Sequence, residues 1–102
     1  MVGGSVTASF ALSLSPATVH PAGTVTVTWA NIPKPTAYDW AALYAAGAPD
    51  YMVKAWKYTG GGPSGSLTLT VPWGSAPGTY EVRLFSNNSY TRLGTATLTV
   101  VS

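Results

Sequence analysis

Few side chains of this chain could take part in acid, base or nucleophilic catalysis. The sequence holds a single histidine, His20, with three acidic residues and no cysteine. A catalytic nucleophile needs a base within hydrogen-bonding reach, and two carboxylates acting as acid and base need a cleft that shifts their pKa values. Asp39 and Glu81 could approach one another across neighbouring strands, but no spacing in the sequence pairs a nucleophile with a base. We therefore expect a non-catalytic protein rather than an enzyme.

The donors that hold metal ions are equally scarce. Structural zinc sites use thiolates and clustered histidines, and calcium takes about six to eight oxygen ligands, usually with several carboxylates. One histidine and three scattered acidic residues do not supply such sets. We expect no metal site and no other cofactor.

Aromatic and cationic side chains are the groups that could bind a ligand. The chain has four tryptophans and six tyrosines, while only 8% of its residues are charged, against roughly 25% in a typical soluble domain. A surface of this composition suits stacking and hydrogen bonding better than electrostatic steering. The residues expected to form a ligand-binding face are Trp40, Tyr44, Lys54, Trp56, Tyr58, Arg83, Phe85 and Arg92.

The distribution of charge and apolar residues argues against nucleic acid as a partner and against a membrane span. The net charge of +2 arises from cations scattered singly along the chain, so no basic run points to nucleic acid. No stretch approaches the ~18 apolar residues of a membrane span. The aromatic residues therefore carry most of the functional information.

Alternating patterns predict that these side chains lie on β-strands. Residues 24–29 (TVTVTW) alternate and are rich in β-branched residues, so Val25, Val27 and Trp29 should face a core. Further strands are predicted at 8–14, 39–44, 52–58, 66–71, 79–85 and 95–100. The inward residues of the last three are predicted to be Leu67, Leu69, Val71, Tyr80, Val82, Leu84, Ala96, Leu98 and Val100.

The segment 39–44 admits two strand phases. Trp40 and Tyr44 could face inward, because they are bulky, or Ala41 and Leu43 could do so and leave both aromatic rings outside. The second phase is favoured, although the alanines of this region could instead form a short helix. On residues 52–58, Lys54 is expected to share the outer face with Trp56 and Tyr58.

The strands on either side should extend that face. Arg83 and Phe85 point outward from residues 79–85, and they join the same face if the third, fourth, sixth and seventh strands form one sheet. Each large aromatic side chain presents about 150–250 Å². A few half-exposed rings would therefore make an unusually large apolar patch.

Seven strands separated by turn signals predict an all-β, Greek-key β-sandwich of the immunoglobulin-like, fibronectin type III kind. Tyr80, near the start of the sixth strand, is placed where such sandwiches carry a tyrosine whose hydroxyl bonds to upstream backbone. The length allows one domain, which we expect to span residues 9–102. Residues 1–8 are expected to be a flexible or vector-derived tail.

Several segments resemble known families. Residues 26–29 (TVTW) and 78–84 (GTYEVRL) resemble fibronectin type III and other immunoglobulin-like modules. The series 39–44 (DWAALY), Tyr51, 54–58 (KAWKY), 80–85 (YEVRLF) and 90–93 (YTRL) is similar to immunoglobulin-like modules appended to secreted bacterial hydrolases and phosphatases, and distantly to SKICH domains. It covers residues 10–101 and departs from the pattern at Ala41, where a larger aliphatic residue is expected. The resemblance implies a non-catalytic accessory module of a larger extracellular or cell-surface protein.

Two functions of different classes fit these features. The first is carbohydrate binding, in which aromatic rings pack on a polysaccharide while Asp39 and the cations hydrogen-bond to its hydroxyls. The second is a structural spacer or protein-interaction module that docks a neighbouring domain. Low charge and long threonine-rich strands also make pairing of edge strands in a dimer plausible.

Overall fold

The computed structural model describes residues 10–102, and β-strands are the regular elements of this range. The alanine-rich segment after Asp39 is a strand, so the helical alternative is wrong there. The strands are β1 (Ala11–Ser15), β2 (Thr18–Val19), β3 (Thr24–Ala30), β4 (Trp40–Ala45), β5 (Ala55–Tyr58), β6 (Gly65–Thr70), β7 (Gly78–Ser86) and β8 (Thr91–Val100). Within the described range, no helix is long and apolar enough to cross a membrane.

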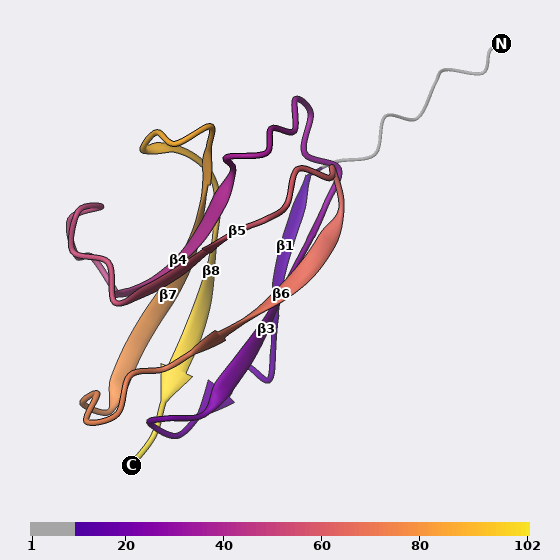
Figure 1. The fold of residues 1–102 in the computed structure, drawn as a ribbon. Coiled ribbons are helices and arrows are strands. Elements are labelled where there is room, and N and C mark those ends of the chain that lie inside the picture. Colours follow the sequence, from indigo (N-terminus) through magenta and orange to yellow (C-terminus); the bar gives the residue numbers. More distant parts are fainter. Residues whose placement is uncertain (1–9) are drawn as a thin grey trace, which may run out of the picture.

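The strands form two sheets that face each other as in a β-sandwich (Figure 1). One sheet has the order β1-β3-β6 and the other the order β2-β8-β7-β4-β5. Neighbouring strands are antiparallel, apart from β2 and β8, which are parallel. The all-β prediction is confirmed, and β4, β5, β7 and β8 share one sheet, as the prediction of an outer face required.

The described residues contain eight strands rather than the predicted seven, because the short strand β2, which follows the predicted first strand, was not expected. β1 ends at Ser15, directly before Pro16, where proline offers no N–H to the ladder. Before it, β1 pairs with β3; after it, β2 pairs with the end of β8 in the other sheet. The predicted tail, residues 1–8, lies outside the described residues, as does the start of the predicted first strand.

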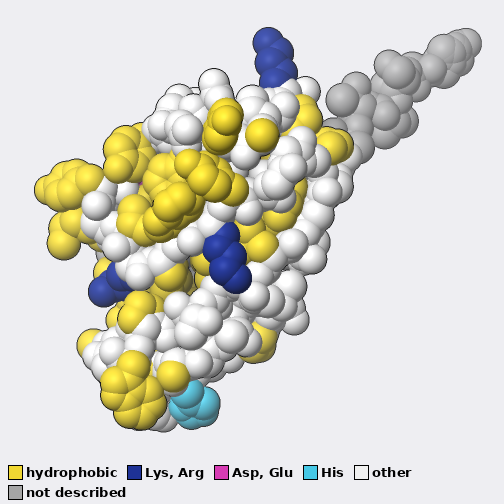
Figure 2. All heavy atoms as spheres, viewed as in Figure 1, with side chains coloured by type: hydrophobic (Ala, Val, Ile, Leu, Met, Phe, Trp, Pro, Cys, Tyr) yellow, Lys and Arg dark blue, Asp and Glu magenta, His cyan; other side chains and the backbone are white. Residues whose placement is uncertain are grey.

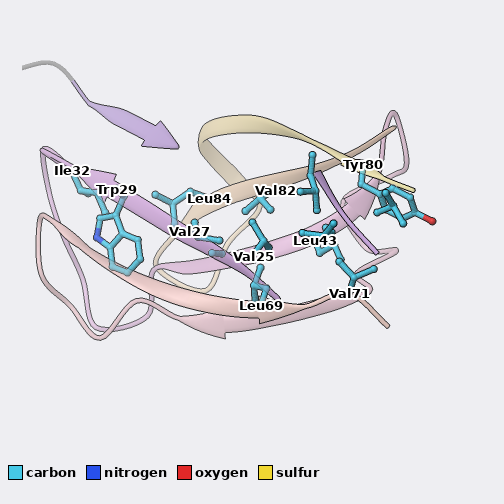
Figure 3. Packing of buried hydrophobic residues seen from close by; sticks show 14 residues of the cluster. Val25, Val27, Trp29, Ile32, Leu43, Leu69, Val71, Tyr80, Val82 and Leu84 are labelled. Atoms are coloured by element: carbon cyan, nitrogen blue, oxygen red, sulfur yellow. The ribbon is translucent and has the colours of Figure 1, made fainter. Parts of the chain in front are cut away.

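The main core lies between the two sheets (Figure 3). Trp29 and Ile32 close one end of this core, while Val71 and Tyr80 lie at the other. The Tyr80 hydroxyl donates to the backbone oxygen of Ala76 at 2.7 Å, so the predicted bond to upstream backbone is present. Two of the predicted core residues, Leu67 and Ala96, are half-buried. The fully buried ones are Val25, Val27, Trp29, Leu69, Val71, Tyr80, Val82, Leu84, Leu98 and Val100.

The strand β4 is buried on both of its faces. Ala41 and Leu43 belong to the core between the sheets, while Ala42 and Tyr44 belong to a second, smaller cluster on the opposite face. The phase that turns Trp40 and Tyr44 away from the main core is therefore the observed one. This outer face carries the candidate site.

Candidate functional site

Strand register brings the predicted aromatic residues together on the outer face of the five-stranded sheet. Trp40 on β4 pairs with Tyr58 on β5 and with Phe85 on β7. One step along, the small residue Ala42 pairs with Trp56 on β5. Because side chains directly opposite on neighbouring strands touch, residues far apart in sequence form one aromatic surface.

The inner layer of this surface is buried. Phe85 lies under Trp40, with ring centroids 4.6 Å apart, and under Tyr90, with centroids 5.6 Å apart. Tyr44 meets the edge of Phe85 at 6.1 Å, and neither Tyr44 nor Phe85 has exposed surface. The prediction that these two rings contact a ligand is therefore wrong, since other rings and the segment between β4 and β5 cover them.

The outer layer lines an open groove of about 340 Å³. Trp56, Tyr58 and Tyr90 are 49%, 44% and 55% exposed, while Trp40 is half-buried at the groove. Figure 2 shows hydrophobic side chains gathered over the part of the molecule where β4 and β5 run. The groove is lined by Trp40, Val53, Trp56, Tyr58, Asn88 and Tyr90.

Polar atoms lie beside the rings of the groove. The Tyr58 hydroxyl donates to Asn88 Oδ1 at 2.9 Å, and Trp40 Nε1 donates to the backbone oxygen of Ser89 at 3.1 Å. Both acceptors belong to the turn between β7 and β8. The groove therefore combines apolar ring faces with an amide and a hydroxyl, a combination that suits an organic ligand bearing hydroxyl groups.

Arg83 is not available to a ligand, which corrects its predicted role. Its side chain is 2% exposed, and its guanidinium lies 4.1 Å from the centroid of the Tyr44 ring. It donates through Nε to Glu81 at 2.6 Å and through Nη1 to Asp50 Oδ1 at 2.8 Å. A buried cation needs such partners, and both carboxylates are used to satisfy it.

Arg92 lies at the margin of the same charge cluster. It pairs with Phe85 in strand register, and its Nη2 donates to Asp50 Oδ1 at 3.0 Å. Its side chain is 43% exposed. Asp50 thus connects β7 and β8 to the segment between β4 and β5, and this segment supplies Val53 to the groove.

The same segment fixes the ionisation of Tyr44. The Tyr44 hydroxyl donates to the backbone oxygen of Asp50 at 2.7 Å. Burial, together with the nearby negative charge of Asp50, raises the pKa of Tyr44 from 10.0 to about 12. Tyr44 is therefore a neutral hydrogen-bond donor that anchors this segment.

Lys54 points away from the groove, so its predicted position is also wrong. Its backbone N–H donates to the oxygen of Leu43, which the ladder pairs with the next residue, Ala55. Two successive residues therefore face Leu43, and the alternation of side chains breaks before β5. Lys54 Nζ lies 5.8 Å from the ring centroid of Tyr80, a residue of the main core.

Asp39 has a structural role instead of the expected ligand contact. Its buried carboxylate accepts from the backbone N–H groups of Thr36 at 2.9 Å and Asn87 at 3.0 Å, and from the Thr36 hydroxyl at 2.7 Å. It therefore ties the loop before β4 to the turn after β7. Among the ion pairs of the described residues, Glu81 is joined to Arg83 and not to Asp39.

Three groove residues were absent from the predicted ligand-binding face, namely Val53, Asn88 and Tyr90. Asn87 and Asn88 have positive φ values of 48° and 57°, and this turn returns the chain so that Tyr90 covers Phe85. Asparagine tolerates that conformation, so consecutive asparagines between two predicted strands are a signal for a tight turn. Tyr90 could have been found from that signal, but Val53 could not, because it depends on the broken alternation at Lys54.

The described residues include no group of three or more His, Cys, Asp or Glu side chains that could hold a metal ion. Comparison of the sequence with protein-family models and with curated proteins gave no match. The resemblance to immunoglobulin-like accessory modules therefore stays a prediction, and the groove itself is the basis for any functional argument.

Proposed function

We propose that the chain is a non-catalytic accessory module that binds carbohydrate in the groove on the outer face of β4 and β5. The observation that carries this proposal is the exposure of three rings, Trp56, Tyr58 and Tyr90, around the half-buried Trp40. The apolar C–H face of a sugar ring packs on such aromatic surfaces. Its hydroxyl groups can then hydrogen-bond to the Asn88 amide at the rim.

The exposed apolar area of the three rings supports the proposal that the groove binds a ligand. At about 150–250 Å² for each large aromatic side chain, three half-exposed rings leave roughly 200–400 Å² of apolar surface in contact with water. That area reaches the range of the largest patch on a typical monomer, a patch that is often functional. Covering it with a ligand would contribute favourable free energy of burial.

An immunoglobulin-like, fibronectin type III arrangement with Greek-key connections is part of the proposal. Three strands in one sheet face β8, β7, β4 and β5 in the other, and β2 is added beside β8. The bond from Tyr80 to Ala76 also supports it, because such a bond is a feature of these sandwiches. We propose that the module works as part of a larger bacterial protein outside the cell or on its surface.

Binding can be tested by titrating the chain with a panel of soluble oligosaccharides and polysaccharides and following tryptophan fluorescence. We expect a saturable change in fluorescence, with at least ~10-fold weaker binding by Trp56→Ala, a loss of about 1.4 kcal/mol. Trp73→Ala is the matched control, since Trp73 is 86% exposed and lies outside the groove. Equal weakening by both substitutions, or no binding across the panel, would overturn the proposal.

Docking of a neighbouring protein domain is the second candidate function. Tyr51 and Met52, which precede the groove residue Val53, are 73% and 55% exposed, and they offer an apolar surface without the polar rim of the groove. This candidate predicts that Tyr51→Ser weakens association of the module with its neighbouring domain. Self-association could instead use β5, which is an edge strand of the five-stranded sheet among the described residues.

A further inference from the structure

We infer that the ligand of the groove is a single, uncharged glycan chain, and neither a charged polysaccharide nor the flat surface of a crystalline one. The inference rests on the proposed function, because it specifies the class of carbohydrate that the same groove takes. Three features carry it: the charges around the groove, the orientation of its rings and the polar groups at its rim.

The side chains that line the groove carry no formal charge. None of the six described lining residues is a lysine, arginine, histidine, aspartate or glutamate. An acidic sugar bound there would lose part of its hydration without gaining a cation, and a charge desolvated without a partner is costly. The same reasoning disfavours a cationic amino sugar, for which the lining offers no carboxylate.

The charged residues nearest in the sheet are directed elsewhere. Arg83 is buried between Glu81 and Asp50, and Arg92 shares the same Asp50 oxygen. Lys57 on β5 donates to the Thr68 hydroxyl of the opposite sheet at 3.4 Å. Lys54 lies over the Tyr80 ring. Engaging an acidic sugar would require one of these cations to leave its present partner.

The rings of the groove are steeply inclined to one another. The planes of Trp40 and Trp56 meet at 78°, those of Trp56 and Tyr58 at 87°, and those of Trp40 and Tyr90 at 63°. A flat crystalline face can lie on only one plane at a time, so it would contact a single ring. A single chain can enter the angle between the rings and contact several of them.

The size and rim of the groove match a short segment of such a chain. Its volume of about 340 Å³ lies at the lower end of the 300–1,000 Å³ or so that ligand pockets occupy. Asn88 Oδ1 accepts the Tyr58 hydroxyl at 2.9 Å, which orients the Asn88 amide so that its N–H₂ group carries two donors. The hydroxyl groups of a neutral sugar can accept hydrogen bonds from these two donors, and neither partner then carries a charge.

The test compares soluble neutral glucans, mannans and xylans with polygalacturonate, alginate and soluble chitosan, and adds a depletion assay on microcrystalline cellulose. We expect a neutral soluble glycan to bind at least ~10-fold more tightly than every charged polymer. We also expect cellulose to deplete no more of the unchanged chain than of the Trp56→Ala variant. Asn88→Gly keeps the backbone at φ 57° accessible, and we expect it to weaken neutral-glycan binding several-fold. Val53→Lys places a cation in the groove, and we expect it to raise affinity for polygalacturonate.

The outcomes separate this inference from the proposed function. Tight binding of a polyuronate or of chitosan, or depletion by cellulose, would overturn the inference if the Trp56→Ala substitution abolished that binding. The proposed function, carbohydrate binding in the groove, would still stand. Unchanged neutral-glycan binding by Asn88→Gly would overturn the role of the rim. The absence of binding to every polymer would overturn the proposed function itself.

Discussion

The ion pair between Asp50 and Arg83 should help the Tyr44 hydroxyl to hold the segment between β4 and β5 against the sheet. Asp50 Oδ1 accepts from Arg83 Nη1 at 2.8 Å and from Arg92 Nη2 at 3.0 Å. The two distances are similar, but the side chains differ in burial, because Arg83 is 2% exposed and Arg92 is 43% exposed. Burial should decide which of the two pairs contributes to stability.

The expected magnitudes follow from that difference. A hydrogen bond to a charged group contributes about 1.5–3 kcal/mol where water is excluded, whereas an exposed ion pair contributes about 0.2–1 kcal/mol. Asp50 is itself 30% exposed, which places the Arg83 pair toward the lower end of its range. We expect Asp50→Asn to lower the free energy of unfolding by about 2–3 kcal/mol.

Two double-mutant cycles separate the contributions of the two ion pairs to stability. Asp50→Asn is combined in turn with Arg83→Met and with Arg92→Met, and each variant is unfolded in urea while tryptophan fluorescence is followed. We expect a coupling energy of about 1.5–2.5 kcal/mol for Asp50 with Arg83 and under about 1 kcal/mol for Asp50 with Arg92. Equal couplings, a larger one for Arg92, or a total cost for Asp50→Asn below about 0.5 kcal/mol would refute the reasoning.

Two further predictions concern Tyr44, which is buried on the outer face of the five-stranded sheet, and Gly65, which lies beside Trp29 of the main core. Tyr44 in the folded chain has a pKa of about 12, whereas an unfolded tyrosine ionises near pH 10. As the pH rises, the unfolded state therefore releases the proton first. The stability contributed by neutral Tyr44 is complete below pH 10 and is lost progressively toward pH 12. That loss is on the order of 2–3 kcal/mol, and urea midpoints measured across this pH range should fall less steeply for Tyr44→Phe than for Tyr90→Phe. A Cβ at Gly65 would lie 3.0 Å from Cζ2 of the buried Trp29, so Gly65→Ala should lower the free energy of unfolding by about 1–2 kcal/mol through overpacking. Ser66→Ala on the same strand should change the unfolding free energy by less than about 0.5 kcal/mol, and a stability of Gly65→Ala equal to that of the unchanged chain would contradict the prediction.

Strand periodicity was sufficient to predict most of the fold. The alternation of residues 24–29 placed Val25, Val27 and Trp29 in the core, where they are. The pattern of residues 79–85 likewise separated the core residue Val82 from the outer-face residue Phe85. Alternation works at these positions because each strand has one face directed into the main core.

The same periodicity could not predict which outward side chains are exposed. Tyr44, Arg83 and Phe85 do lie on the outer face of the sheet, as expected, yet all three are buried there. They are covered by Tyr90 and by the segment after β4. The position of that segment depends on contacts such as the Asp50 ion pairs. A sequence pattern reports the face of a strand but not what packs over it.

The position of Lys54 could not be predicted for a related reason. A single extra residue opposite Leu43 reverses the faces of Lys54 and Val53 relative to a regular strand over residues 52–58. This irregularity moves Lys54 off the outer face and places Val53 in the groove. The uncharged Val53 thus lines the groove in place of the predicted Lys54. This difference is one reason that a neutral ligand is expected.

The buried layer beneath the groove bears on how strongly a ligand could bind. Trp40 is held by stacking on Phe85, by ring contacts with Trp56 and Tyr90, and by the bond from its Nε1 to the oxygen of Ser89. Immobilising a side chain on binding costs about 0.5–1.5 kcal/mol, and much of that cost for Trp40 is already met in the folded chain. Phe85 and Tyr44, although they cannot touch a ligand, fix the floor on which it would lie. These two residues, which the sequence wrongly predicted to contact the ligand, therefore preorganise the groove.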